Sequence, residues 1–252
     1  INNINNTYTK IVPEKAHKLL QTTSSFFLKT KDDDRGIKFK IRKTLDSIDY
    51  NNNFYWNMIS LGFKESELNK ILIKSSEGSF DYYKNNIGLN KSDSLSDLRN
   101  IDKHISLEGD MLVKVDRTSM LSSLECRAPF LNKKLWDFTN RLPEKYLING
   151  TSKKYILKES FKDVFPSNFL EKTKKGFGVP VGDWLRSFLK DELIYFCNKS
   201  FIEEQNLFNY STIEQLVNRH LSGQEDNTFK VWTYFCFQKC IKIIFKLMNK
   251  KL

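Results

Sequence analysis

The sequence predicts a mostly α-helical globular chain, and three observations support this fold class. Apolar residues make up 40% of the 252 positions, which is enough to bury a core in a chain of this length. Long stretches place apolar side chains at steps of three and four, the spacing of one helix face. The apolar–polar alternation of strands is hard to find, and no internal repeat is visible.

The first half of the chain is expected to hold two helical stretches. Residues 14–28 carry apolar side chains at helical spacing, and the charged run 31–36 interrupts them. A second helical stretch covers residues 54–73. The run 75–100 is rich in Ser, Asp, Asn and Gly, which predicts an exposed loop with a short helix.

The second half is also expected to be helical, with loops between the helices. Residues 110–124 read as one helix. Ser152 is placed to cap a helix that Pro166 stops, and Asp183 is placed to cap the next one. Residues 213–248 read as two further helices.

Charge and hydropathy exclude some classes of partner. The formal net charge is +11, but lysines recur along the whole chain, and no helix-turn-helix, RNA-binding or zinc-finger signature is present. Nucleic acid is therefore disfavoured as a partner. No window approaches twenty uninterrupted apolar residues, so we expect a soluble chain with no membrane partner.

The cysteines and histidines form no metal-binding pattern. Four Cys include no C-x-x-C pair, and three scattered His offer no spacing for zinc. Cys236 and Cys240 lie one helical turn apart and could share a metal, but buried thiols on an apolar helix face are far commoner. We expect no metal site and a reduced, cytoplasmic compartment. The first residues carry neither an initiating Met nor a secretory signal, so a fragment or truncated frame is expected.

Residues 110–120 form the most informative segment, with the sequence DMLVKVDRTSM. At 100° per residue, Asp116 and Arg117 fall on the same face as an apolar stripe. Buried charges need partners, and Arg127 is a candidate third member of the group. From the pattern alone, a structural ion pair between helices is favoured over a catalytic role.

A second segment, residues 172–180, has the sequence KTKKGFGVP. Lysine beside glycine suits phosphate binding, because glycine lets the backbone approach an anion and the ammonium supplies a point charge. Lysine-rich solvated loops are common, so a plain exposed loop is the alternative. The apolar Phe177 and the Val-Pro pair after it favour the phosphate-binding interpretation.

Several sequence blocks together resemble the asparagine synthetase family. The segment DMLVKVDRTSM is followed by SLECRAPFL at residues 123–131, which is similar to the family's S-L-E-x-R-x-P-F-L-D. The similarity continues, in the family's order and approximate spacing, through LP at 142–143, KYILKE at 154–159, KKGFGVP at 174–180 and WLR at 184–186. Strong similarity covers residues 102–186.

The resemblance implies a fold and an activity. The fold is the helical C-terminal portion of an α/β PP-loop synthetase domain, of the adenine nucleotide α-hydrolase-like type. The implied enzyme is an ATP-dependent amidotransferase, a ligase of asparagine biosynthesis. Aspartate's side-chain carboxylate attacks ATP to give an aspartyl-adenylate (aspartyl-AMP), and glutamine-derived ammonia then displaces AMP.

The resemblance also implies cofactors and partners that this chain does not supply. The family's S-G-G-x-D-S loop for ATP and the terminal Cys of its glutaminase domain do not occur in this sequence. We therefore expect ATP and Mg²⁺ to need the N-terminal part of the synthetase domain, and the isolated chain to be inactive. The expected partners are aspartate or another carboxylate substrate, together with the glutaminase domain and PP-loop segment of the same enzyme.

Roles carry over from the family residue by residue. Lys174 falls where the family keeps a lysine that reaches the phosphates and the adenylated intermediate, so it is the expected catalytic residue. The residues expected to support the substrate and phosphate site are Asp116, Arg117, Glu125, Arg127, Gly176 and Phe177. Asn132 replaces the usual Asp after P-F-L, and Ser106 and Glu108 replace a common Tyr and Pro. These departures leave the acceptor carboxylate open.

The expected organisation has three consecutive segments. Residues 1–100 form a variable helical region with a polar loop, residues 101–190 the motif-bearing core of the synthetase domain, and residues 191–252 the C-terminal helices. The leading hypothesis for function is conversion of aspartate to asparagine by the intact enzyme. The alternatives are a related adenylating amidotransferase acting on a sugar or peptide carboxylate, a non-enzymatic helical remnant, and a basic nucleic-acid binder.

Overall fold

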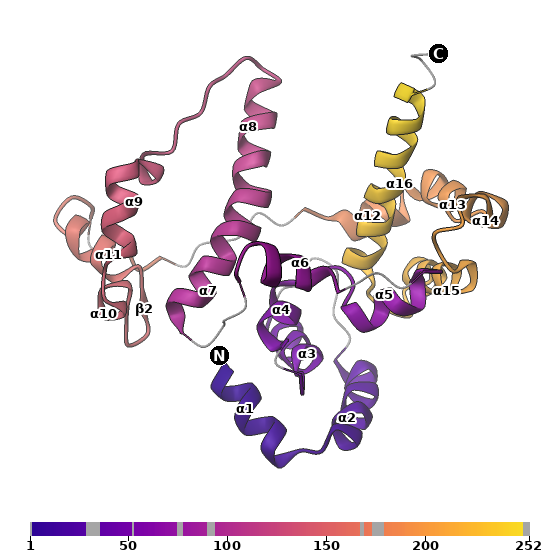
Figure 1. The fold of residues 1–252 in the computed structure, drawn as a ribbon, viewed down its shortest axis with the longest axis horizontal. Helices are drawn as coiled ribbons and strands as arrows, with labels where there is room; N and C mark the ends of the chain where they lie inside the picture. The colour runs from indigo at the N-terminus through magenta and orange to yellow at the C-terminus, as the bar shows by residue number, and fades with distance from the viewer. Residues whose placement is uncertain are drawn as a thin grey trace. The chain divides into compact units, whose positions relative to one another are not determined.

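The computed structural model divides the chain into two compact units, whose elements are labelled in Figure 1. Unit 1 combines residues 1–88 with residues 177–252, and unit 2 comprises residues 89–176. The three segments expected from the sequence were defined by their motifs, whereas these two units are defined by their contacts. The division into three segments therefore stays a prediction. The structure describes residues 2–28, 36–51, 53–74, 78–89, 94–166, 169–172 and 179–248.

Helices build both units, which confirms the expected mostly α fold. None of the described helices is long and apolar enough to cross a membrane. The helices of unit 1 are α1 (Asn2–Ile11), α2 (Glu14–Phe27), α3 (Ile37–Ser47), α4 (Phe54–Ile59), α5 (Glu65–Ile71), α6 (Ser79–Asn86), α12 (Val181–Arg186), α13 (Lys190–Phe196), α14 (Lys199–Gln205), α15 (Tyr210–Leu221) and α16 (Thr228–Met248). The elements of unit 2 are α7 (Leu95–Asp102), η1 (Lys103–Leu112), α8 (Val113–Met120), η2 (Pro129–Leu131), α9 (Lys133–Asn140), α10 (Glu144–Leu147), β1 (Ile148–Asn149), β2 (Ser152–Lys153) and α11 (Tyr155–Phe161).

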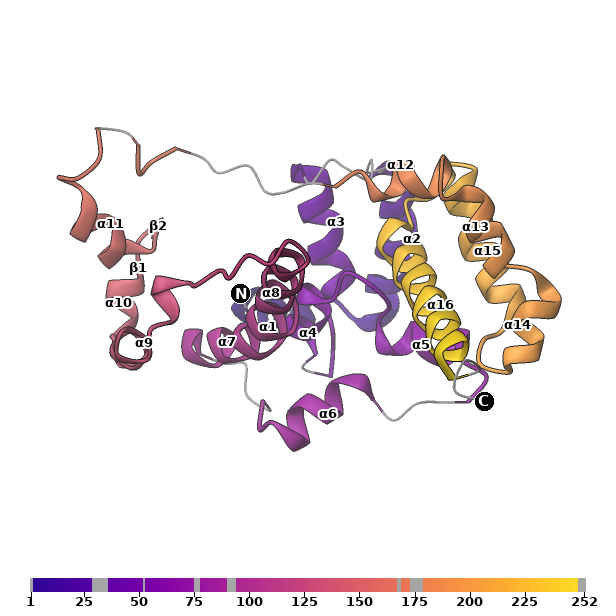
Figure 2. The same ribbon diagram turned by 90° about the horizontal axis from the view of Figure 1, so that it is seen from above.

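The core of unit 1 forms where α16 packs against α12, α13 and α15 (Figure 1, Figure 2). On α16, Val231, Tyr234 and Phe235 follow one another at helical spacing and are at most 3% exposed. Leu193 and Phe196 of α13 are fully buried in the same cluster. The ring of Phe196 meets that of Phe235 edge-on, with centroids 5.7 Å apart. Each such side chain stabilises the fold by roughly 1.5–3 kcal/mol on burial.

Two polar side chains of α16 are paired inside this core. Gln238 is fully buried, and its amide exchanges two hydrogen bonds with that of Gln205, at 2.7 and 2.9 Å. The Tyr234 hydroxyl donates to the carbonyl oxygen of Phe196 at 2.6 Å, and burial raises the pKa of that hydroxyl. Unpaired buried polar groups are costly, so these bonds favour one register of α16 against α13 and α14.

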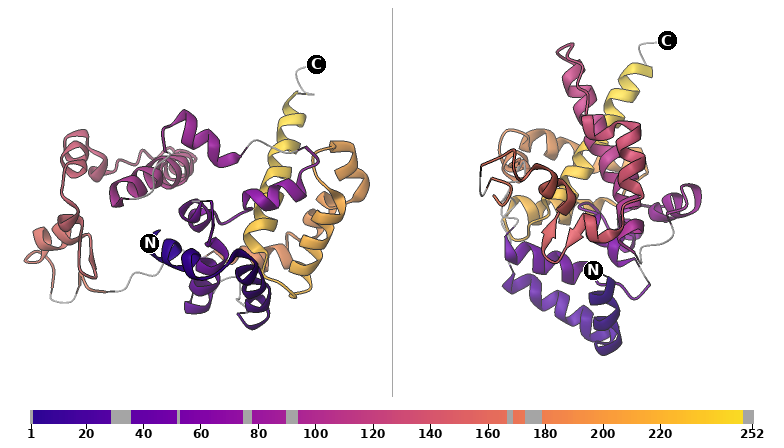
Figure 3. Two further views of the ribbon diagram at one scale, coloured as in Figure 1. Left: turned by 60° about the horizontal axis from the view of Figure 1, so that its bottom comes forward. Right: turned by 90° about the vertical axis from the view of Figure 1, so that its left-hand side faces the viewer.

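Side-chain contacts between distant residues hold the N-terminal helices of unit 1 together; these helices are indigo and violet in Figure 3. Asn5 of α1 donates to the carbonyl oxygen of Asp49 at 2.9 Å and accepts from the amide of the same residue at 3.0 Å. His17 of α2 has its ring centroid 5.5 Å from that of Tyr8 and 6.0 Å from that of Tyr50. Both contacts tie α1 and α2 to the segment that follows α3.

Backbone pairing joins the two stretches of chain that make up unit 1. Leu72, directly after α5, forms an isolated antiparallel bridge with Phe208, between α14 and α15. The amide of Asn209 donates to the carbonyl oxygen of Ile71 at 2.7 Å. α5 is therefore fixed to the C-terminal helices, although more than a hundred residues separate them in sequence.

Unit 2 begins with one continuous helical rod formed by α7, η1 and α8 (Figure 1). η1 is a π-helix of ten residues, which is unusual because π-helices mostly occur as single turns. The helix predicted over residues 110–124 thus begins inside the π-helical part and ends at Met120. Ser123 adopts a left-handed φ of 54°, which stops the helix there.

Unit 2 buries little of its apolar surface. Of the described residues between 94 and 172, Ile101 alone is buried. Large apolar side chains of η1, α8, the segment after it and α9 are exposed, namely Met111, Val113, Val115, Met120, Leu121, Leu124, Phe130, Leu135 and Phe138. Exposed apolar side chains in this number are typical of a surface that another protein segment covers.

Some predicted helix boundaries are wrong and others are confirmed. The stretch 54–73 divides into α4 and α5, and Gly62 between them lies so close to α16 that a Cβ there would come within 2.9 Å of the Thr233 hydroxyl. Ser152 pairs in β2, and Asp183 lies within the first turn of α12, so neither residue caps a helix. The two helices expected over 213–248 are present as α15 and α16.

Two neighbouring positions of α13 test the core. Leu193→Ala removes a fully buried side chain and should lower the free energy of unfolding by roughly 2–5 kcal/mol. Ile194→Ala, at a position that is 49% exposed, should lower it much less. Urea unfolding followed by circular dichroism measures both, and equal losses would mean that this packing is wrong.

Candidate functional site

The charged pair predicted in the apolar stripe lies on α8, and its predicted burial is wrong for this chain. Asp116 and Arg117 are both exposed, and so are Val113 and Met120 of the stripe. Among the described residues, no ion pair includes either charge. Because these side chains remain in water, they need no partner to offset a desolvation cost. The structural ion pair between helices is therefore not formed in this chain.

Glu125 and Arg127 lie in the extended segment after α8 and pair with each other. Their charged atoms are 2.6 Å apart, and the two side chains are 68% and 86% exposed. Residues two apart in extended backbone point to the same side, which explains the pairing. An exposed pair of this kind contributes little to stability. Arg127 thus pairs with its neighbour Glu125, and not with Asp116 as expected.

Three residues expected at the phosphate site lie outside the described residues. They are Lys174, Gly176 and Phe177. Directly before them, the Lys172 ammonium lies 5.8 Å from the centroid of the Phe169 ring. The placement of Lys174 against a phosphate therefore stays a prediction.

Asn132, which stands where the family usually has Asp, caps a helix. Its side-chain oxygen accepts a hydrogen bond from the amide of Lys134 at 3.1 Å, at the N-terminus of α9. Asn and Asp cap helix N-termini about equally well. The departure at this position therefore has a structural explanation that does not involve the acceptor carboxylate.

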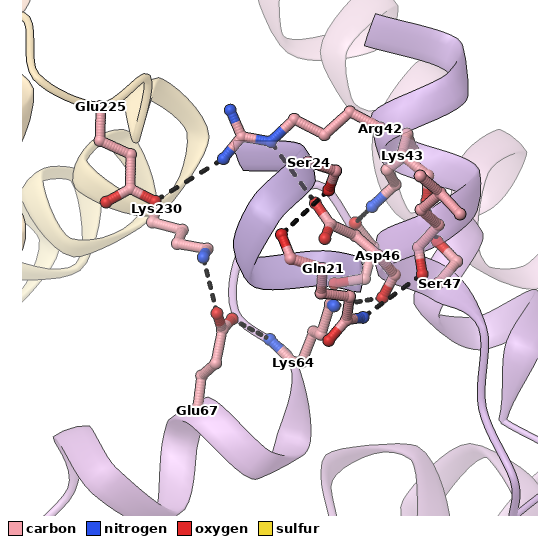
Figure 4. A network of polar contacts seen from close by, with 12 residues as sticks. Gln21, Ser24, Arg42, Lys43, Asp46, Ser47, Lys64, Glu67, Glu225 and Lys230 are labelled. Carbon is pink, nitrogen blue, oxygen red and sulfur yellow. Dashed lines mark hydrogen bonds and ion pairs between the residues drawn. The ribbon is translucent and has the colours of Figure 1, made fainter. Parts of the chain in front are cut away.

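A cavity of about 410 Å³ in unit 1 is lined by eight charged side chains, several of which form the polar network drawn in Figure 4. We call it the α3–α5–α16 cavity, after the helices that supply most of these charges. The Lys230 ammonium lies 2.6 Å from a carboxylate oxygen of Glu67. The Arg42 guanidinium lies 3.6 Å from Glu225 and 3.7 Å from Asp46. The residues that line the cavity are Gln21, Thr22, Phe39, Arg42, Lys43, Asp46, Ser60, Leu61, Gly62, Lys64, Glu67, Glu225, Asp226, Asn227, Phe229 and Lys230.

Two lysines in this cavity have perturbed pKa values. The Lys43 ammonium donates to the carbonyl oxygen of Ser60, and the Lys64 ammonium donates to that of Asp46. Burial, with repulsion from Lys64, lowers the pKa of Lys43 to about 8. Burial also lowers the pKa of Lys64. Although burial alone would raise the pKa of Glu67, the Lys230 ammonium beside it holds that pKa below its usual value.

No sequence pattern indicates this cavity. Lys43 and Lys64 are twenty-one positions apart in a chain with 41 Lys and Arg residues, and only the packing of α3 against the segment before α5 brings them together. Perturbed pKa values cluster at functional sites, so the cavity is a candidate site in its own right.

Unit 2 has a second cavity, of about 610 Å³, between η1 and α9. The Lys103 ammonium lies 4.9 Å from the centroid of a Trp136 ring and donates to the side-chain oxygen of Asn140 at 2.5 Å. Burial, with the charge of Arg99, lowers the pKa of Lys103. Glu108, one of the positions that departs from the family pattern, also lines this cavity.

The described part of the chain shows no candidate metal centre, and the Cys197 thiol is unreactive. Those residues include no group of three or more His, Cys, Asp or Glu that could hold a metal ion. Burial raises the pKa of the Cys197 thiol to about 12, so it stays protonated at neutral pH.

The pH dependence of stability tests the burial of Lys43. Because its pKa falls from 10.5 to about 8 on folding, the unfolded chain holds more protons between these values, and stability should rise with pH through this window. Asp46, Glu67, Lys64 and Lys230 act on the same ammonium. Relative to Lys43→Met, the gain in the wild-type chain should be on the order of 1 kcal/mol, after allowing for solvent screening.

Urea unfolding at pH 8, 9 and 10 gives this difference. Lys40→Met, on the exposed face of the same helix, is the matched control and should leave the pH dependence of the wild-type chain unchanged. If Lys43→Met had the same pH dependence as the wild-type chain, the Lys43 ammonium would not be buried as described.

Comparison with known proteins gives this chain a family. The family model described as asparagine synthase matches residues 17–247. The chain is similar to glutamine-hydrolysing asparagine synthetase 1 of Bacillus subtilis (strain 168), with 30% identity over 153 residues, 58% of this chain and 23% of that protein. It is 31% identical over 147 residues to putative glutamine-hydrolysing asparagine synthetases of Mycobacterium bovis and Mycobacterium tuberculosis, which covers 58% of this chain and 22% of each relative.

The chain spans less than a quarter of the length of these relatives. No solved structure matches it. Since the family model covers most of the chain, including every motif block noted in the sequence, the chain belongs to the asparagine synthase family.

Proposed function

We propose that this chain is part of an ATP-dependent amidotransferase that converts aspartate to asparagine, and that it contributes the helical part of the synthetase site. The observation that carries the proposal is the ordered set of motif blocks between residues 110 and 186, all inside the family match. The names of the relatives agree with this activity.

The proposed reaction proceeds in two steps. The aspartate side-chain carboxylate attacks the α-phosphorus of ATP, a new P–O bond forms, and the bond to pyrophosphate breaks. Ammonia released from glutamine then attacks the activated carbonyl, and AMP leaves with the electron pair of the C–O bond. The first step builds negative charge on the departing pyrophosphate, so a cation placed there accelerates it.

Lys174 is the residue of this chain that we assign to that task. Its neighbours Gly176 and Phe177 would shape the loop, since glycine lets the backbone approach an anion closely. Asp116 and Arg117 would form, with the 125–127 pair, the charged wall that supports the site. Their exposure here agrees with a surface that meets nucleotide or protein supplied by the rest of the enzyme.

ATP and Mg²⁺ are assigned to the intact enzyme and not to this chain alone. Mg²⁺ is usually held by one or two carboxylates together with substrate phosphates. The described residues hold no acidic cluster that would bind the ion, and the family's S-G-G-x-D-S loop is not in the sequence. The ion is therefore assigned, with ATP, to the part of the enzyme that carries that loop. We expect the isolated chain to be inactive.

The exposed apolar surface of unit 2 supports a role inside a larger enzyme. Leu121, for example, is 87% exposed. An apolar side chain of this kind stabilises the protein only when another segment covers it and removes it from water. The curated relatives are more than four times as long as the part that matches this chain. The PP-loop segment is the occupant we propose for this surface, with the glutaminase domain as the source of ammonia in a cytoplasmic enzyme.

A second acceptor is kept as a candidate because Glu108, at a departure from the family pattern, lines the cavity of unit 2. A sugar or peptide carboxylate in place of aspartate would use the same adenylation chemistry. Exchange of pyrophosphate into ATP, measured with each carboxylate in turn on the intact enzyme, separates the two candidates.

The central test is exchange of labelled pyrophosphate into ATP in the presence of aspartate. In the intact enzyme, Lys174→Ala should lower aspartate-dependent exchange by roughly 10²–10³-fold, because it removes a charge that stabilises the transition state. Lys172→Ala, two positions earlier, is the matched control and should retain most of the activity.

Circular dichroism should give the same spectrum for both variants and the wild-type enzyme. Near-normal exchange by Lys174→Ala would remove the proposed role of this lysine. An intact enzyme without aspartate-dependent exchange would remove asparagine synthesis as its function.

A further inference from the structure

The α3–α5–α16 cavity holds two ammonium groups that lack a carboxylate partner among the described residues. Lys43 and Lys64 donate to backbone carbonyl oxygens, those of Ser60 and Asp46. Both lysines line the cavity, and both side chains are partly buried. A carbonyl dipole satisfies a donor but does not neutralise its charge. The carboxylates of Asp46 and Glu67 attract both ammonium groups at longer range, but neither forms a direct ion pair with them.

The acidic side chains around the cavity are already engaged elsewhere. Glu67 pairs with Lys230 at 2.6 Å, and its second oxygen accepts from the backbone amide at the start of α5 at 3.0 Å. Glu225 lies 3.6 Å from both Arg42 and Arg219 (Figure 4). Asp46 faces Arg42 at 3.7 Å, and Asp226 accepts from the backbone amide of Thr228 at 3.1 Å. The formal charges that line the cavity balance, but the pairing leaves the two lysine ammonium groups out.

A third donor at the same cavity is unsatisfied. The side-chain nitrogen of Asn227 is buried and has no hydrogen-bond partner, and the residue is 5% exposed. Asn227 lines the same cavity as Lys43 and Lys64. Buried donors without acceptors are rare in folded proteins, and a bound acceptor is one explanation for such a donor.

We propose that the α3–α5–α16 cavity binds a phosphoryl group, carried by a small phosphomonoester or by free phosphate. A phosphoryl group supplies a charge of about −1.5 to −2 at neutral pH and three strong acceptor oxygens. Those properties suit two ammonium groups that have no direct carboxylate partner, and lysine binds phosphate as a point charge. The volume of about 410 Å³ lies in the range typical of small-molecule sites.

The residues that form this site are different from those assigned to the proposed synthetase site. All the residues that form it belong to unit 1 and lie outside residues 110–180, where the family motifs are concentrated. A negative result in the pyrophosphate exchange assay would therefore not argue against phosphate binding in this cavity. A negative result in the phosphate-binding experiment would not argue against the synthetase assignment.

Isothermal titration of the full chain at pH 7 tests the proposal, with inorganic phosphate and glycerol phosphate as the two phosphoryl probes. Succinate, a dicarboxylate of the same charge, and chloride at matched ionic strength are the controls. Either phosphoryl probe should bind saturably and more tightly than both controls. Binding by both probes assigns the affinity to the phosphoryl group, and binding by the ester alone adds a contribution from its organic part.

The variants place the binding in the cavity. Lys43→Gln and Lys64→Gln should each weaken binding at least about tenfold, which is the loss expected on removing one charge-assisted contact. Lys40→Gln, exposed on α3, should bind as the wild-type chain does. If circular dichroism shows that one Gln variant does not fold, the affinity of the other variant tests the proposal. Absence of saturable binding, equal binding of succinate, or unchanged affinity in the folded variants would overturn the proposal.

Discussion

The apolar stripe of α16 can leave water only by packing against α12, α13 and α15, and the rest of unit 1 depends on that burial. The stripe brings Gln238 into the core, where the amide must pair with Gln205. The same packing places Lys230, one residue before Val231, opposite Glu67 on α5. The packing of α16 thus places its residues where the Lys230–Glu67 pair, together with the Leu72–Phe208 bridge, can join the two stretches of chain in unit 1.

Unit 2 lacks a comparable core in the part that the structure describes. Its rod of α7, η1 and α8 leaves apolar side chains in water, and the motif charges Asp116 and Arg117 are solvated. The family motifs are therefore concentrated in the unit with the least burial of its own. This arrangement is expected if another segment of the enzyme covers the exposed face and completes the site. Residues that contact such a segment cannot at the same time be buried in the core of unit 2.

Periodicity was sufficient to predict the helical fold, since a stripe such as that of α15 or α16 can be buried only as a helix. Periodicity failed where contacts with other parts of the fold determine the local structure or the burial of a residue. Ser152 was expected to cap a helix, but it lies in β2 and pairs with Asn149 of β1. Asp116 was expected to be buried but is exposed, because the pattern shows an apolar stripe and not whether another element covers it. The α3–α5–α16 cavity had no sequence signal, since tertiary packing alone brings Lys43 and Lys64 together and partly buries them. The motif blocks predicted the family because they repeat its residues, and the position of Lys174 is still a prediction.

The central claim is that unit 1 is stabilised by its own core, whereas the apolar face of unit 2 needs the rest of the enzyme. Amide hydrogen exchange, measured by mass spectrometry on the isolated chain and on the intact enzyme, tests it directly because protection follows local stability. The account predicts strong protection of residues 231–238 in both samples, and weak protection of residues 113–120 in the isolated chain that becomes strong in the intact enzyme. Equal protection of the two segments in the isolated chain, or no change at residues 113–120 in the intact enzyme, would contradict it.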